Sequence, residues 1–166
     1  MTLTKKSKAL IVAATLVLIF LISFPYIYTV SAVEPDPIVV MKNLKARGIA
    51  VQTVNDENLK SPAKFVLGLT PTEASVTVKK FEVGSGTIEV GGATYTITNG
   101  NGAVLPRKHV IVLQATGTDA EGQGVTLSLV GRYFWIGKRL FFVRMAGKLQ
   151  TETGNSVLLM LAAIRF

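Results

Sequence analysis

The chain has 166 residues, of which 49% are hydrophobic, and it carries 18 lysines and arginines against 10 aspartates and glutamates, a net charge of +8 at pH 7. It contains no cysteine and a single histidine, His109, which excludes disulfides, cysteine nucleophiles and any metal site or proton relay built on cysteines or paired histidines. The part after residue 32 is long enough for one domain with one core, and its mild basic excess suits an anionic surface or polymer.

An apolar stretch without charges covers residues 9–33, between a lysine-rich start and Glu34. Basic residues before such a segment and acidic residues after it orient its N-terminus toward the cytoplasm, so we expect the rest of the chain to be extracytoplasmic. The leading interpretation is a cleaved secretory signal formed by residues 1–32. Small residues before the predicted cut, between Ala32 and Val33, suit a signal peptidase.

Two other interpretations of this stretch stay open. In the first, the segment is an uncleaved membrane anchor, because a helix extended through Pro25 to Val33 would be about 37 Å long. The second starts from Lys8-Ala9-Leu10-Ile11, a basic residue and a small one before the apolar helix. This pattern resembles the processing site of archaeal type IV pilin-like precursors, although the glutamate of the bacterial pattern is missing. The resemblance implies a cut before the helix and a helix retained in a filament core.

Residues 33–48 are predicted to form a linker followed by one short helix. Asp36 is a good N-cap, Pro37 suits the first helical position, and Gly48 can end the helix behind a cluster of cations. The pattern predicts a helix over 37–47 that buries Val40, Met41 and Leu44. The β-branched run at 38–40 argues for a strand instead.

From residue 49 to the end of the chain, apolar and polar residues alternate with a period of two, which indicates β-strands. Turns are predicted around Pro71, at 84–86 and at 99–102, because glycine and proline mark turns. We therefore expect a mainly β domain over 49–166, an antiparallel meander that forms a small β-sandwich or a closed barrel. The predicted strands are 49–54, 64–69, 75–83, 86–90, 93–98, 108–116, 125–130, 132–136, 140–148 and a last strand that ends at Phe166.

Gly91-Gly92 lies between two alternating runs and is the best local signal in the chain. Two glycines predict a tight two-residue hairpin, because the turns that match strand twist need positive φ. This register places Tyr95 against Ile88 on the core side. The full set of predicted pairs is Val90 with Ala93, Ile88 with Tyr95 and Gly86 with Ile97 on the apolar face, and Glu89 with Thr94 and Thr87 with Thr96 on the wet face.

Short motifs that could carry chemistry are incomplete. Residues 84–86 lack the spacing of a serine nucleophile elbow, and 99–102 lack the lysine and the helix of a phosphate loop. Residues 119–122 lack most ligands of a calcium loop, and His109 stands at a predicted strand start. We therefore predict that the protein is not an enzyme, and we assign no catalytic residue, cofactor or metal site.

An aromatic and basic segment at 132–144 is the candidate interaction surface. If Gly137-Lys138 is the turn, Phe134 pairs with Phe141 on the face opposite to the core. Such a pair is either covered by another element or forms an exposed patch ringed by cations. The residues assigned to this surface are Arg132, Phe134, Lys138, Arg139, Phe141 and Arg144.

These expectations favour a non-enzymatic exported β domain that acts as a cell-envelope or filament-type interaction module. Its partner would be a protein or an envelope polymer, including another copy of the chain, and its N-terminal segment would contact the membrane. One alternative is a binding module for an anionic polymer or lipid surface that uses the basic and aromatic hairpin. The other is a type IV pilin-like subunit. Nucleic acid is disfavoured, because an exported domain rarely meets it.

Overall fold

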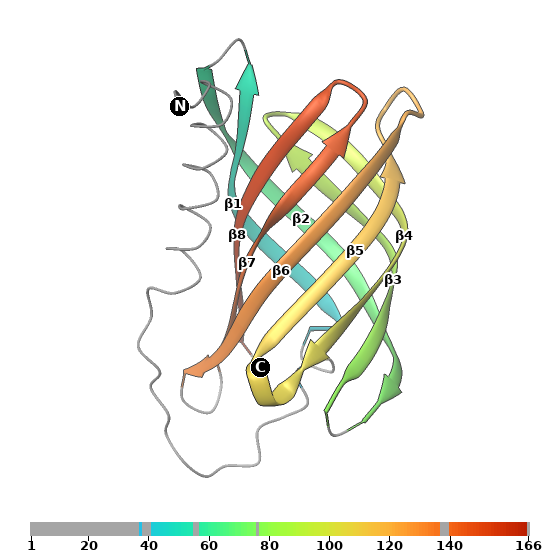
Figure 1. Ribbon diagram of the computed structural model, residues 1–166, viewed down its shortest axis with the longest axis vertical. Coiled ribbons are helices and arrows are strands. Elements are labelled where there is room, and N and C mark those ends of the chain that lie inside the picture. Colours follow the sequence, from blue (N-terminus) through green and yellow to red (C-terminus); the bar gives the residue numbers. More distant parts are fainter. Residues whose placement is uncertain (1–36, 38–40, 55–56, 76, 137–139, 166) are drawn as a thin grey trace, which may run out of the picture.

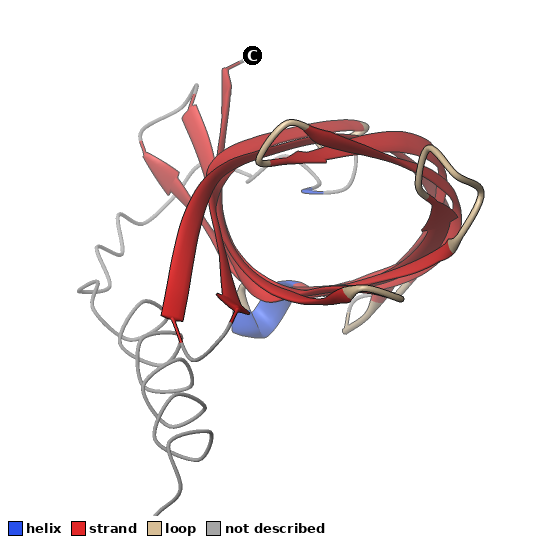
Figure 2. Cartoon of the chain, turned by 90° about the horizontal axis from the view of Figure 1, so that it is seen from above, coloured by secondary structure: helices blue, strands red, loops and turns tan. Residues whose placement is uncertain are grey.

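Eight antiparallel strands, each paired with the next along the chain, close into a barrel where the last strand pairs with the first (Figure 1). Figure 2 looks along the barrel and shows the closed ring. Of the two predicted closures of a mainly β meander, the barrel is the one that forms. The elements are β1 (Asn43–Val54), β2 (Glu57–Ala74), β3 (Lys79–Val90), β4 (Ala93–Leu105), the 3-10 helix η1 (Pro106–Lys108), β5 (Val110–Thr118), β6 (Gly124–Ile136), β7 (Leu140–Thr151) and β8 (Gly154–Arg165).

This computed structural model describes residues 37, 41–54, 57–75, 77–136 and 140–165. The predicted leader, with its cleavage site at Ala32 and Val33, its anchor interpretation and its pilin-like interpretation, lies outside the described residues. Within the described residues, no helix has the length and apolarity needed to cross a membrane.

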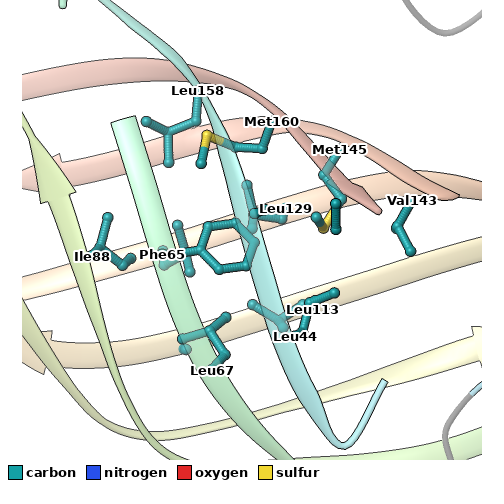
Figure 3. Close-up of a cluster of buried hydrophobic side chains, with 14 of the residues drawn as sticks. Leu44, Phe65, Leu67, Ile88, Leu113, Leu129, Val143, Met145, Leu158 and Met160 are labelled. Atoms are coloured by element: carbon teal, nitrogen blue, oxygen red, sulfur yellow. The ribbon is translucent and has the colours of Figure 1, made fainter. Parts of the chain in front are cut away.

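The interior of the barrel is filled by apolar side chains that come from all eight strands. An eight-stranded barrel is just wide enough for side chains to fill its centre. Figure 3 shows the residues that meet there, among them Phe65, Leu67, Ile88, Leu113, Leu129, Met145, Leu158 and Met160. Ser156 is a buried polar residue of this interior, and its Oγ accepts a hydrogen bond of 2.8 Å from Nε2 of Gln52. The core is therefore packed, and the outer wall carries the charged side chains.

The first strand replaces the C-terminal half of the predicted helix. The N–H of Met41 donates to the carbonyl oxygen of Pro37 at 3.0 Å, and β1 begins at Asn43. The prediction of a helix over 37–47 is therefore wrong for its C-terminal half. From Leu44 on, alternate side chains point into the barrel, and β1 bonds to both β2 and β8. Because a helix here would leave two sheet edges open, closure of the barrel overrides the local capping signals.

The strands are longer and fewer than predicted, because several glycines lie inside strands. The predicted turn at 99–102 is wrong, since these residues belong to β4. A Cβ added to Gly100 would stand 2.6 Å from the Cβ of Ala115, and one added to Gly102 would overlap the ring of Phe81. These glycines give space to neighbouring side chains in a narrow interior and do not mark turns. β2 likewise continues through Pro71, beside a register shift that accommodates the proline.

The hairpin around Gly91-Gly92 forms as predicted. Both glycines have positive φ, 59° and 93°, and all five predicted cross-strand pairs are present. Tyr95 lies opposite Ile88 and packs against the core, although it is half-buried. Thr94 and Thr96 are exposed on the outer face. The turn chemistry of two glycines therefore fixed the register of this part of the sheet.

Candidate interaction surface

The aromatic hairpin of β6 and β7 forms with a register one residue away from the predicted one. Ile136 lies opposite Leu140, Trp135 opposite Phe141 and Phe134 opposite Phe142. Residues 137–139, and with them Lys138 and Arg139 of the predicted surface, lie outside the described residues. The predicted turn at Gly137-Lys138 falls on these residues. The predicted pairing of Phe134 with Phe141 is wrong, and every side chain of β7 changes face relative to the prediction.

Phe141 points into the barrel and belongs to the core. Its exposed fraction is 0%, and its ring centroid lies 4.6 Å from that of Trp135 and 5.2 Å from that of Tyr133. The assignment of Phe141 to the interaction surface is thus wrong. The physical reason is the parity of the strand, because a shift of one residue moves a side chain from one face of a sheet to the other.

The second aromatic pair does lie on the outer face, with Phe142 in the place predicted for Phe141. The rings of Phe134 and Phe142 stack with their centroids 5.5 Å apart and their planes 9° from parallel. Both rings are half-buried. On the hairpin-end side of this pair lie Ile136, which is 53% exposed, and Leu140. This stacked aromatic pair therefore lies outside the core, on the outer face of the hairpin.

Arg132 and Arg144 lie opposite each other on the other side of the stacked rings, on the same outer face. Burial beside apolar neighbours lowers the pKa of the Arg144 guanidinium from its ordinary value, although an arginine stays protonated at any physiological pH. Of the six residues predicted for the surface, the structure places Arg132, Phe134 and Arg144 together on it.

The charges of the barrel wall are segregated. On β2 and β3, ion pairs of 2.8 Å join Lys64 to Glu89 and Lys80 to Glu73. β6, β7, β8 and β1 contain no aspartate or glutamate, and the outer face of these four strands is called the cationic wall here. Its described cations are Lys45, Arg47, Arg132, Arg144 and Lys148. The carboxylates of the described residues all lie elsewhere, at Glu57, Glu73, Glu82, Glu89, Asp119, Glu121 and Glu152.

Apolar side chains are exposed between these cations. Ile49 is 40% exposed, Val130 43% and Leu161 44%, all on the cationic wall. At the border with β2 the wall is hollowed by an open groove of about 570 Å³, whose lining includes Lys45, Arg47, Lys64, Val66, Glu89 and Leu161. Large hydrophobic residues next to cations are the composition of a contact surface.

His109 lies at the junction of η1 and β6 and contacts Tyr133. It ends η1 with a left-handed backbone, φ 52° and ψ 38°, and its ring lies 5.3 Å from that of Tyr133. Its carbonyl oxygen accepts a hydrogen bond of 3.0 Å from the N–H of Tyr133, which ties η1 to β6. In the described part of the chain, no three histidine, aspartate or glutamate side chains come together as a metal site would require.

No protein-family model and no curated protein matches the chain. Among solved structures, it is similar to the crystal structure of a conserved protein of unknown function from Rhodopseudomonas palustris. The two chains share 13% sequence identity, the match covers 74% of this chain and 95% of the other, and the TM-score is 0.42. A likeness this distant carries no information about function.

Proposed function

We propose that the protein is a non-enzymatic exported module that acts by surface contact, in the cell envelope or in a filament. The observation that carries the proposal is the cationic wall, where exposed apolar side chains and a stacked pair of phenylalanines lie among arginines and lysines. Aromatic residues and arginine are the residue types enriched at contact hot spots.

The closed barrel restricts how a partner can bind. Each described strand is bonded to a neighbour on both sides, so a partner cannot add a strand to a free sheet edge. The described core side chains pack together in the centre of the barrel. The proposal therefore places the contact on outward side chains, and the cationic wall has a composition that suits it.

Replacing both stacked phenylalanines should abolish self-association without unfolding the domain. Phe134→Ser with Phe142→Ser removes apolar surface from the outer face while the core stays intact, so the loss of stability should be about 1–2 kcal/mol. Sedimentation velocity over a range of concentrations measures association, and circular dichroism measures folding. The matched control is Thr94→Ser with Thr96→Ser on the outer face of β4. If association of the double phenylalanine variant equals that of the wild type, the wall is not the contact surface between copies.

A second candidate is a binding module for an anionic polymer or lipid surface. The observation that favours it is the segregation of charge, since a wall with cations and no carboxylates attracts anions along its whole width. The pilin-like alternative and the export of the domain both depend on the N-terminal segment.

The N-terminal residue of the mature protein distinguishes the three interpretations of that segment. We expect a start at Val33, because small residues precede this position and Pro25 interrupts the apolar run. Intact-mass measurement with N-terminal sequencing reads the position directly. A start at Leu10 would favour the filament subunit, and a full-length chain would favour a membrane anchor.

A further inference from the structure

An apolar strip runs along the outer face of β8 and β1, the two strands that close the barrel. On each strand, residues buried in the core alternate with residues that point outward. Ile49 lies opposite Leu159, and the exposed fractions of Ile49 and Leu161 are 40% and 44%. The outward apolar residues of the strip, which is called the β8–β1 seam here, are Val157, Leu159, Leu161 and Ala163 on β8 and Ile49 and Val51 on β1.

Exposed lysines lie on both sides of the β8–β1 seam. Val51 and Val157 form one cross-strand pair of the seam, and their next outward neighbours are Lys60 on β2 and Lys148 on β7. Both lysines are exposed. Three strand spacings separate them, which is about 14 Å along the wall. The seam is therefore an apolar surface two strands wide with a cation on either side.

Two further cations follow the seam on β1 toward the start of the strand. Arg47 lies opposite Leu161, Lys45 is the next outward residue, and both are exposed. Both line the open groove of about 570 Å³ together with Leu161. Lys64 in the same groove pairs with Glu89 at 2.8 Å, whereas no carboxylate of the described residues pairs with Arg47 or Lys45. An acidic partner could therefore bind these two cations without breaking an ion pair of the described barrel.

The dimensions of this surface favour a helix as its occupant. An α-helix is about 10–12 Å wide with its side chains, so its apolar stripe would cover two strands while acidic residues on its flanks reach Lys60 and Lys148. From Val157 to Ala163 the seam is about 20 Å long, the length of about four helical turns. A single acyl chain would cover the seam but would not reach cations on both sides. Two copies of this chain related by a two-fold axis would bring their own cations together.

We propose that the β8–β1 seam docks an acidic amphipathic helix of a partner protein. The apolar stripe of the helix packs on the seam, and its glutamates and aspartates contact Lys45, Arg47, Lys60 and Lys148. The proposal rests on the surface-contact function proposed above and names the chemistry of the partner. Charge complementarity carries it, since β8 and β1 contain no carboxylate that would repel those of the helix.

A synthetic peptide of this chemistry is the probe. A fluorescein-labelled helix of about four turns carries leucines at i, i+3, i+4 and i+7 and glutamates on either side of them, and in a second peptide lysines replace the glutamates. Fluorescence anisotropy measures the binding of each peptide to the full chain. We expect the glutamate peptide to bind at least about 10-fold more tightly than the lysine peptide. Added salt should weaken its binding, because salt screens the attraction.

Removing the two cations beside the seam should raise the Kd of the glutamate peptide about 10-fold. The variant is Lys45→Gln with Arg47→Gln. Its matched control is Arg107→Gln with Lys108→Gln, the same loss of one lysine and one arginine from exposed positions on η1, which lies between β4 and β5 on the far side of the ring of strands. The control should bind like the wild type. Reversing the two charges, with Lys45→Glu and Arg47→Glu, should make the lysine peptide the tighter ligand, a result that a loss of folding cannot produce.

The apolar part of the contact has its own variant. Leu161→Ser removes an exposed apolar side chain from the seam and should raise the Kd of the glutamate peptide about 10-fold. Ile136→Ser is the matched control, because Ile136 is 53% exposed on β6 and lies outside the seam. Both variants should stay folded by circular dichroism, since both side chains are on the outer face.

Equal affinity for the two peptides would overturn the proposal, as would equal losses in the Lys45 and Arg47 variant and its control on η1. Phosphatidylglycerol vesicles and self-association test the other occupants. If the glutamate peptide does not bind, but Lys45→Gln with Arg47→Gln abolishes vesicle binding or self-association, the occupant is a lipid or another copy. The helix proposal then fails while the surface-contact function survives. If neither peptide nor vesicles bind and the double phenylalanine variant leaves self-association unchanged, the surface-contact function itself is wrong.

Discussion

Phe141→Ala should cost the fold about 4 kcal/mol, whereas Phe142→Ala should cost about 1 kcal/mol or less. The two residues are neighbours in sequence and have the same side chain, but Phe141 is 0% exposed in the core and Phe142 is half-buried on the outer face. Removing the ring of Phe141 leaves a cavity beside Trp135 and Tyr133, to which a packed barrel adapts only in part.

Denaturant titration of the two variants gives the free energies of unfolding. An unchanged m-value shows that the variants expose the same surface on unfolding, so that their free energies can be compared. The contrast tests the register of β6 and β7 directly. If Phe142→Ala were the more damaging change, the strands would pair with a two-residue loop at Gly137-Lys138, and the stacked outer pair would not exist.

The two hairpins show where sequence determines register and where it does not. At Gly91-Gly92 only glycine takes the positive φ values of a two-residue loop at no steric cost, so the loop and its five pairs follow from the residues. Between Ile136 and Leu140 the residues Gly137-Lys138-Arg139 allow a loop of two or three residues. Both faces of these strands carry apolar residues, so the sequence pattern does not indicate which face enters the core.

Local signals failed where closure of the barrel decides the structure. Asp36, Pro37 and Gly48 are good helix signals, but the strand that begins at Asn43 joins β2 to β8 and completes the wall. Leu44 and Ala46 already alternate there with Lys45 and Arg47. Long-range pairing of this kind outweighs propensities worth a fraction of a kcal/mol per residue.

The position of the cationic wall can be predicted from the distribution of carboxylates in the sequence. Residues 122–151 contain no aspartate or glutamate, and neither do 43–54 and 154–165. Once β-strands are assigned, these three stretches without carboxylates identify the whole cationic wall, because β6, β7, β8 and β1 are consecutive around the barrel. The prediction of Arg132, Phe134 and Arg144 rested on composition within one hairpin, which is why it missed Lys45 and Arg47 on β1.

A methyl group added at Gly102 should destabilise the barrel by about 2–3 kcal/mol. The Cβ of Gly102→Ala would overlap the ring of Phe81, which is 1% exposed in the core, and would stand 2.5 Å from the carbonyl oxygen of Val112. Neither neighbour can move far, since one is packed in the interior and the other belongs to the backbone of β5. This is the expected result if the glycines of β4 give space to the core and do not mark a turn.

Gly124→Ala is the matched control, because nothing lies within 4 Å of a Cβ at that position. It should change stability by about 0.5 kcal/mol or less, or raise it slightly through the lower entropy of the unfolded chain. Thermal and denaturant unfolding compare the two variants. Shortening the opposing side chain sharpens the test, since Phe81→Leu combined with Gly102→Ala should cost about 1 kcal/mol less than the sum of the single changes. Additive losses, or a Gly102→Ala variant as stable as Gly124→Ala, would mean that β4 does not run through 99–102 beside Phe81, and that a turn lies there instead.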